Sequence, residues 1–358
     1  MSDRIFDLLA HLDAAIGVSG HEEAVADVMV AELEGAYDSH EVDPMGNHYF
    51  TRAGADGGPT VMLCAHMDEL GFVIRHIEDE GFLRIGPVGG HDARMVVDQD
   101  IAVHGLDGEV HGITGAKPAH LVERDERKLA IPMEELFVDV GTSSREESEA
   151  LGVRVGQVAT FRRDGALLNR SRVFSGKAVD DRAGCAVMVE AMRLLSGRDL
   201  DITVCATASV QEEIGLRGAE VAGARIKPDL ALALDVTVCG DTPGVEFRRS
   251  PIALGAGPAI KYFDSGGSSG APVPRRLTDR LEKAADGAGI TYQREVLFGG
   301  GTDAWAIGTS GLGVVAGCVS VPSRYIHSAV GCVNLDDVEG AAKLVVAFIE
   351  DVAQNGLP

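Results

Sequence analysis

The N-terminal part of the chain changes from a helical to a strand-like pattern of apolar positions. Within residues 1–37, apolar side chains recur every three to four positions, which predicts two helices. Ser19 and Glu22 have the spacing of a capping box at the start of the second helix. Residues 48–52 and 60–66 predict two strands, and the second run is apolar almost throughout, as in a central strand covered on both faces.

Between about Gly71 and Arg163 the pattern becomes a series of short alternating runs, separated by glycine, proline and aspartate. Such runs predict strands. Residues 144–152 are the exception, because a serine followed by an acidic run indicates one short helix. We therefore predict a small β-rich domain over residues 71–163, inserted between the two parts of an α/β domain at residues 1–70 and 164–358.

Helical and strand-like patterns alternate again after Ser175. This alternation predicts an α/β fold, in which a mostly parallel, doubly wound sheet carries helices on both faces. The Gly- and Ser-rich stretch 243–272 predicts a long loop, of the kind that usually borders a functional site. The predicted helices lie at 180–197, 217–223, 275–289 and 335–353, and the predicted strands at 201–210, 229–236, 291–298 and 312–321.

The charge balance excludes several classes of partner. The 358 residues include 55 acidic and 32 basic side chains, for a net charge of −23, so the field of the protein repels nucleic acid and anionic membranes. Only seven of the basic residues are lysine. An acid-rich, lysine-poor surface is typical of proteins that work in concentrated salt, where screening removes self-repulsion. An ordinary acidic protein encoded by a GC-rich genome is the alternative.

The cysteines and the apolar runs predict a cytoplasmic protein. No CxxC pair occurs, so we interpret the cysteines as reduced core residues. No apolar run reaches the length of a membrane span. Acidic residues within the first apolar pattern indicate a helix and not a signal peptide. The six single cysteines are Cys64, Cys185, Cys205, Cys239, Cys318 and Cys332.

Histidines and carboxylates gather where apolar runs end or where helices begin. In open parallel sheets, ligands bind beyond the carboxyl ends of the strands, so these side chains are expected to meet in one crevice. Each motif alone has an ordinary explanation, such as a solvated glutamate pair or two aspartates at a helix N-terminus. Their joint occurrence at strand ends favours a two-metal site. The residues are His66, Asp68, Asp180, Glu212, Glu213, Asp235 and His327.

Five of these residues suit a pair of divalent ions. Zinc takes imidazole and carboxylate ligands, and two ions about 3.5–4 Å apart need a bridging carboxylate. We assign Asp180 as the bridge, His66 and Asp235 to one ion, and Glu213 and His327 to the other.

Two acidic residues remain for other roles. Glu212 is left without a metal and is the candidate general base. Asp68 lies two residues after His66 and suits a carboxylate that orients the imidazole ring.

The motif GGGTDAWA at 299–306 has two interpretations. Its glycines allow a substrate backbone to approach closely, or the motif is a tight turn with a helix cap at Thr302 or Asp303. The candidate substrate-binding residues are Gly299, Gly300, Gly301 and Thr302. The insertion also contains five histidines at no metal-like spacing, which we interpret as ordinary β-domain residues: His76, His91, His104, His111 and His120.

The motifs AHMDELGF, KAVDDRAG, QEEIGLRGA, ALDV, GGGTDA and RYIHS resemble those of the tetrahedral, or TET-type, aminopeptidases. These enzymes are related to glutamyl and deblocking aminopeptidases. The similarity covers essentially the whole chain, including the insertion, which in that family is a small β-barrel or PDZ-like dimerisation domain. It implies an α/β peptidase fold with the ligand roles assigned above, and catalytic roles for Asp68 and Glu212.

The resemblance also implies cofactors, partners and a mechanism. It implies two zinc or cobalt ions per subunit, short peptide substrates, and self-association into dimers and a hollow dodecamer. Glu212 would take a proton from the attacking water and return it to the leaving amine.

Three other functions are the alternatives to this activity. A related di-metal amidohydrolase, either a deacylase or a carboxypeptidase, would use the same core. A non-catalytic scaffold would leave Glu212 as a carboxylate without a task. The label endoglucanase, which is sometimes used in this family, requires only a carboxylate pair and does not explain the two histidines. Zinc and cobalt are both compatible with the ligands.

Overall fold

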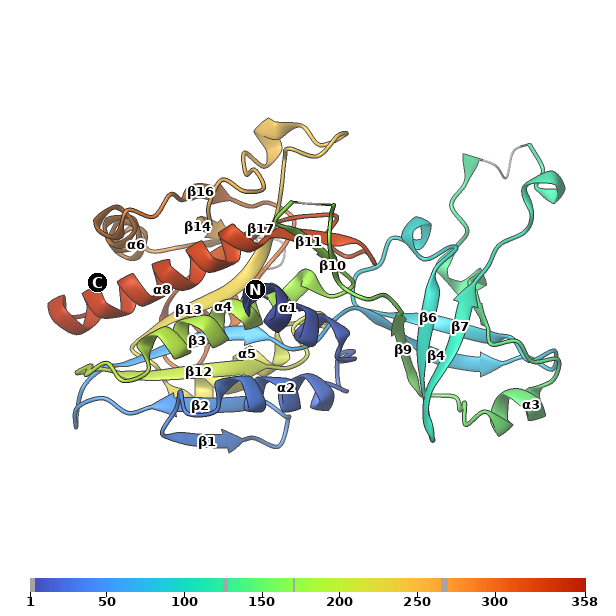
Figure 1. Cartoon of the computed structure of the whole chain (residues 1–358), viewed down its shortest axis with the longest axis horizontal. Helices are drawn as coiled ribbons and strands as arrows, with labels where there is room; N and C mark the ends of the chain where they lie inside the picture. Colours follow the sequence, from blue (N-terminus) through green and yellow to red (C-terminus); the bar gives the residue numbers. More distant parts are fainter. Residues whose placement is uncertain (1–3, 125–127, 170, 265–269) are drawn as a thin grey trace.

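The computed structural model describes residues 4–124, 128–169, 171–264 and 270–358. A large sheet covered by helices and a smaller closed barrel lie side by side (Figure 1). The large sheet has twelve strands, and the barrel has six. The α/β class with an added β-barrel is therefore confirmed.

Four parallel strands form the centre of the large sheet. In order they are β12 (Thr203–Ser209), β3 (Thr60–His66), β13 (Leu230–Val238) and β17 (Val315–Arg324). Almost every residue of β3 and β13 is buried, as expected for strands covered on both faces.

Antiparallel strands flank this parallel centre, so the sheet as a whole is mixed. On one side lie β2 (His48–Arg52) and β1 (Ser39–Val42). On the other side lie β18 (Gly331–Asn334), β11 (Val173–Gly176) and β10 (Ala166–Leu167). The remaining strands are β14 (Ala259–Asp264), which pairs with β17, and its neighbours β15 (Ala271–Pro272) and β16 (Gln293–Val296).

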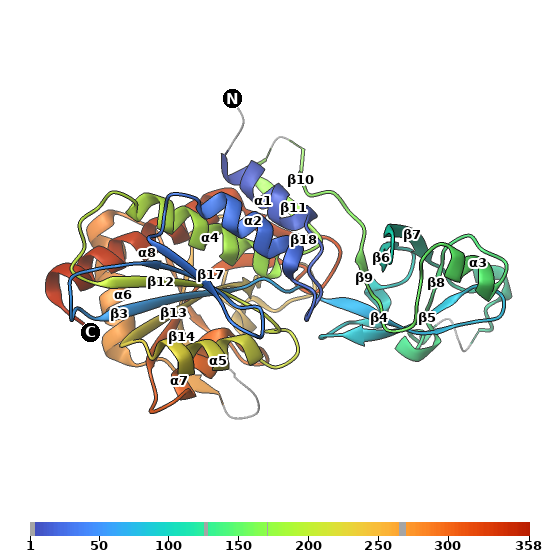
Figure 2. The same cartoon turned by 90° about the horizontal axis from the view of Figure 1, so that it is seen from below.

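Helices cover both faces of the large sheet (Figure 2). Alternate residues of β3 show the division, because Val61 and Leu63 pack into one apolar cluster whereas Met62 and Cys64 pack into another. The first cluster is covered by α1 (Arg4–Ala14), α2 (Glu23–Leu33), α4 (Val179–Leu195), α6 (Arg275–Ala288) and α8 (Leu335–Asn355). The second is covered by α5 (Arg217–Ile226) and α7 (Asp303–Thr309).

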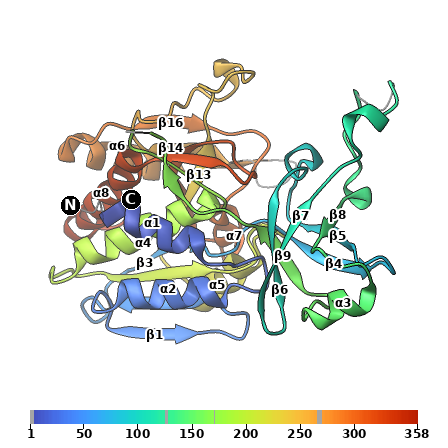
Figure 3. The same cartoon turned by 45° about the vertical axis from the view of Figure 1, so that its right-hand side comes forward.

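The six strands predicted between the two parts of the large sheet close into the barrel (Figure 3). The barrel has its own apolar core. Ser144 caps the short helix α3 (Arg145–Ala150) by accepting a hydrogen bond from the Glu147 amide, as predicted. Around the barrel the strands are β4 (Gly71–Ile77), β5 (Leu83–Val88), β8 (Phe137–Asp139), β7 (Gly108–Thr114), β6 (Asp100–Gly105) and β9 (Val158–Phe161).

The predicted capping box before α2 is wrong. Glu22 occupies the N-cap position but makes no side-chain cap; its carboxylate accepts hydrogen bonds from the amides of Gly20 (2.7 Å) and Gln211 (3.1 Å). Ser19 instead donates to Asp68 Oδ2 at 2.6 Å. Both side chains face the end of the sheet, where tertiary contacts replace the local cap.

The predicted loop at 243–272 is also partly wrong. The stretch includes β14, which joins the sheet at β17, and the edge strand β15; residues 265–269 lie outside the described part. Lys261 and Asp264 are polar yet buried, so β14 lacks the apolar pattern that would have predicted a strand.

No helix in the described part of the chain is long and apolar enough to cross a membrane. All six cysteines are buried and unpaired.

Candidate metal centre

The predicted ligands converge where the large sheet meets the barrel, at the carboxyl ends of the parallel strands. His66 is the last residue of β3, whereas Asp235 lies within β13, which continues to Val238. The other side chains come from the segments after β12 and β17 and from the start of α4: Glu212, Glu213, His327 and Asp180.

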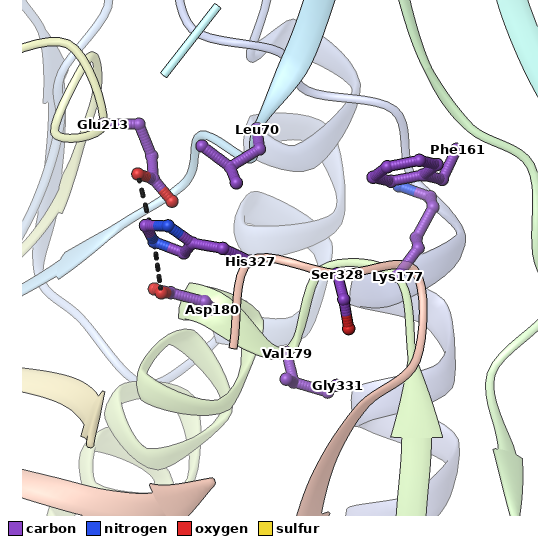
Figure 4. A pocket seen from close by; sticks show the side chains of 9 residues that line it. All are labelled: Leu70, Phe161, Lys177, Val179, Asp180, Glu213, His327, Ser328 and Gly331. Atoms are coloured by element: carbon purple, nitrogen blue, oxygen red, sulfur yellow. Dashed lines mark ion pairs between the residues drawn. The ribbon is translucent and has the colours of Figure 1, made fainter. Parts of the chain in front are cut away.

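Asp180 lies between the two histidines. Its Oδ1 is 3.2 Å from His66 Nε2, and its Oδ2 is 3.4 Å from His327 Nε2. The backbone dihedrals of Asp180 and Asp181 are not helical, so Asp180 is not part of a regular first helical turn. Figure 4 shows His327 between Asp180 and Glu213, whose Oε2 lies 3.6 Å from His327 Nε2.

Three groups of side chains have ligand atoms within 4.8 Å of one another. They share His66, Asp180 and Asp235, so they describe one continuous cluster. Asp181 joins this cluster although the sequence pattern did not single it out. The groups are His66 with Glu212 and Asp235, His66 with Asp180 and Glu213, and Asp180 with Asp181 and Asp235.

The cluster holds more buried negative charge than its two imidazoles can balance. Burial and then the charge of Asp180 raise the pKa of Glu213 to about 8, and the same two causes raise the pKa of Asp235 well above its usual range. Burial likewise raises the pKa of Glu212. Glu213 Oε1 is buried without a hydrogen-bond partner. These residues therefore fit divalent cations, which would balance the charge and bind the free oxygen.

The histidines respond to the same charge. Burial opposes protonation of His66, but Glu212 and the contacts with Asp180 and Asp68 raise its pKa. Burial also opposes protonation of His327, whose pKa is nevertheless raised to about 9, chiefly by Asp180 and Glu213. Metal binding would displace these protons, because a ligating imidazole must be neutral.

Asp68 contacts His66 most closely through its backbone carbonyl, and it contacts the glutamate segment through its carboxylate. Its carbonyl oxygen lies 3.1 Å from His66 Nδ1, closer than its carboxylate at 3.4 Å. The carboxylate accepts hydrogen bonds from the amides of Glu212 (2.9 Å) and Glu213 (3.1 Å), and from Ser19. Asp68 thus ties β3 to the segment that carries both glutamates. Sequence reasoning missed Ser19 because the contact spans 49 residues.

A cavity of about 610 Å³ opens beside the cluster. Gly299, Gly300, Gly301 and Thr302 line it together with Leu297 and Trp305.

Both interpretations of the GGGTDAWA motif agree with this arrangement. The glycines line the cavity, and the Thr302 side chain caps α7 by accepting a hydrogen bond from the Ala304 amide. Asp303, within the same motif, is buried and accepts a hydrogen bond from Ser209 Oγ at 2.6 Å.

The metal-like groups within the described residues include none of the five histidines of the insertion. His91 is an example of their structural use, because its Nε2 lies 2.7 Å from the Gly71 carbonyl and its ring stacks on Phe72.

Comparison with known proteins identifies relatives over the full length of the chain. The family model for the M42 glutamyl aminopeptidases matches residues 46–344. A protein described as a putative aminopeptidase from Acetivibrio thermocellus is 38% identical, with 96% of this chain and 98% of that protein covered. The lysyl aminopeptidase of Pyrococcus furiosus is 35% identical, with 97% of both chains covered.

Solved structures agree with these sequence relatives. The aminopeptidase APDkam598 from the archaeon Desulfurococcus kamchatkensis superimposes with a TM-score of 0.92 at 40% identity, covering 98% of this chain and 95% of that chain. The TET1 peptidase of Pyrococcus horikoshii, described as assembling into a tetrahedron or a large octahedral shell, has a TM-score of 0.84 at 33% identity, covering 96% and 99%.

Proposed function

This chain belongs to the M42 glutamyl aminopeptidase family of peptide-bond hydrolases, and on that premise we propose that it removes N-terminal amino acids from short peptides with two divalent metal ions. One observation carries the two-metal proposal. Asp180 directs one carboxylate oxygen toward His66 and the other toward His327, which is the arrangement that a bridging ligand requires.

The proposed first metal position uses His66 and Asp235, and the second uses Glu213 and His327, with Asp180 shared. Zinc and cobalt both suit this set of imidazole and carboxylate ligands. When bound, such a pair of ions supplies Lewis acidity, which lowers the pKa of a water and stabilises negative charge on a carbonyl oxygen.

Glu212 is proposed as the proton carrier. Its side chain is buried at the cluster, with Oε2 3.9 Å from His66 Nε2, and a carboxylate at this position would accept a proton from water and return it to the leaving amine. The Asp68 carboxylate, bonded to the Glu212 amide, would hold this residue in position.

The cavity beside the cluster is proposed to hold the peptide. Its glycine segment, Gly299–Gly301, would allow the substrate backbone to approach closely, with Thr302 beside it. The one charged lining residue beyond the metal cluster among the described residues is Lys261, whose side chain is fully buried and close to Glu295 at 3.5 Å. The accessible wall therefore favours an uncharged N-terminal side chain.

A panel of substrates would test this function. We expect aminoacyl-p-nitroanilides to be hydrolysed, with leucyl preferred over glutamyl and lysyl substrates, and N-acetylated analogues to be inert. A chelator should abolish the activity, and zinc or cobalt should restore it. Faster cleavage of the acetylated analogues would favour the deacylase alternative. Hydrolysis of a cellulosic substrate would favour the endoglucanase, and a metal-bound but inactive protein would favour the scaffold.

We further propose a cytoplasmic homododecamer built from dimers. The Pyrococcus horikoshii relative, described as assembling into a tetrahedron or a large octahedral shell, supports a large closed assembly, and the PhTET1-12s structure, described as a dodecamer, supports twelve subunits. Six buried, unpaired cysteines support a reducing compartment.

The acidic composition supports adaptation to concentrated salt, and we expect the thermal unfolding midpoint to rise between about 0.1 M and 2 M KCl. Screening to a Debye length of roughly 3 Å or less would remove most of the repulsion behind a net charge of −23. Calorimetry would measure the midpoint, and light scattering at each salt concentration would measure the assembly mass. A midpoint that is unchanged by salt would contradict the proposed halophilic character.

A further inference from the structure

The two histidines of the metal centre are held by different parts of the molecule. His66 has a side chain 2% exposed and contacts the backbone carbonyl of Asp68, which directly follows its own strand. His327 has a side chain 39% exposed and lies in a turn with a φ of +61°. Its Nδ1 lies 3.0 Å from the carbonyl oxygen of Gly90. Gly90 follows β5 and therefore belongs to the barrel insertion.

The Gly90 contact determines which nitrogen of His327 can bind a metal. If Nδ1 donates its proton to the carbonyl, Nε2 keeps a free lone pair, and Nε2 is the atom that faces Asp180 and Glu213. A backbone carbonyl supplies this orientation without adding a charge to an already acidic cluster.

The segment that carries Gly90 is firmly packed. Gly89 has a φ of +83°, and a Cβ at this position would lie 2.3 Å from Leu70 Cδ2 and 3.4 Å from Glu213 Cβ. On the other side, the His91 ring is bonded to the Gly71 carbonyl and stacks on Phe72. The segment Gly89–His91 therefore packs between the start of β4 and Glu213.

We infer that the barrel segment Gly89–His91 is a positioning element for the second metal site, the one that uses Glu213 and His327. The inference rests on the proposed two-metal function. It follows from the position of the segment beside both proposed ligands of that site: Gly90 contacts His327, and Gly89 lies so near Glu213 that an added Cβ would be 3.4 Å from the Glu213 Cβ. His66 and Asp235, in contrast, belong to strands of the large sheet. The barrel then determines the affinity of one metal position and not of the other.

The substitution Gly89→Ala tests this inference. A Cβ 2.3 Å from Leu70 Cδ2 would force the Leu70 side chain or the segment to shift, and a φ of +83° strains the backbone as well, so we expect the Gly90 carbonyl to be displaced. Loss of such a supporting hydrogen bond typically lowers metal affinity by about 10–100-fold. We therefore expect the Co²⁺ binding step of the Glu213–His327 position to weaken by that factor, and the other step to stay within about twofold. Titration calorimetry of the metal-stripped full chain would measure both steps.

Two further variants keep the test independent of folding defects. Gly141→Ala is the matched control, because Gly141 has a φ of +77° but open space around its Cβ position, so it introduces the same backbone strain without the clash. His91→Ala removes the stacking and the bond to Gly71, and it should weaken the same step by a smaller factor even if Gly89→Ala does not fold. His327→Ala identifies that step by abolishing it.

The outcomes separate the inference from the function on which it rests. Equal weakening of both steps, or the same isotherm for Gly89→Ala, His91→Ala and Gly141→Ala, would overturn the positioning role. An unmodified protein that binds fewer than two ions would overturn the two-metal function itself. Excess Co²⁺ should restore kcat in Gly89→Ala. A general folding defect would not be reversed in this way.

Discussion

Replacement of Glu212 by glutamine should lower kcat by about 10²–10⁴-fold while both metal ions stay bound. Glutamine keeps the size of the side chain and the backbone amide that donates to Asp68, but it cannot accept a proton from water. Metal content by elemental analysis and kcat with an aminoacyl-p-nitroanilide would be measured on the same sample.

The adjacent residue provides the matched comparison. Glu213→Gln removes the same charge from a neighbouring buried carboxylate, but Glu213 lies 3.6 Å from His327 Nε2, so we expect loss of the second ion together with activity. Glu212 Oε2 lies 3.9 Å from His66 Nε2 and belongs to one of the metal-like groups, so a ligand role for it is the rival interpretation. Metal loss from Glu212→Gln would favour that rival.

Replacement of Glu69 by alanine should destabilise the fold by about 3–5 kcal/mol, because it breaks a buried charge network. Glu69 accepts hydrogen bonds from Lys177 Nζ at 2.6 and 2.7 Å and lies 3.5 Å from Arg182 Nη2. It also accepts from the Gly17 amide and from Thr160 Oγ1 in strand β9 of the barrel, both at 3.0 Å. Alanine would leave two buried cations without their carboxylate.

Urea unfolding would measure the change in the free energy of unfolding. Glu109→Ala is a suitable control, because Glu109 of β7 pairs with Arg162, the residue after β9; both side chains are about half exposed, and such pairs contribute roughly 0–1 kcal/mol. If Glu69→Ala costs no more than this control, the network does not stabilise the junction between barrel and sheet.

Local patterns predicted most of the regular elements. The central strands β3, β12, β13 and β17 are largely buried because both faces of the sheet are covered. Among the barrel strands, β8 alternates in burial, whereas all four residues of β9 are buried. The strands that escaped prediction are short or carry buried polar residues. In β14, Lys261 and Asp264 interrupt the apolar pattern; Lys261 lies 3.5 Å from Glu295, and Asp264 accepts hydrogen bonds from Thr302, and both partners are more than 30 residues away in the sequence.

The metal centre was predictable for a related reason. Parallel strands bring their carboxyl ends to one edge, so a histidine or carboxylate just after an apolar run marks that edge without any knowledge of the topology. His66 and the Glu212–Glu213 pair follow this rule. Asp181 did not stand out, because an aspartate at the start of a helix has an ordinary explanation.

The sequence by itself determined the kinds of candidate ligand, their order along the chain and the division into an α/β part and a β-rich part, because these features depend on local periodicity and residue type. Only the tertiary structure decided which atoms orient the ligands. The Gly90 carbonyl reaches His327 across 237 residues, and Ser19 reaches Asp68 across 49. Every residue has a backbone carbonyl, so the residue type at position 90 does not indicate this contact. Contacts between residues so far apart in the sequence also leave no periodic pattern. The sequence alone therefore could not predict either contact.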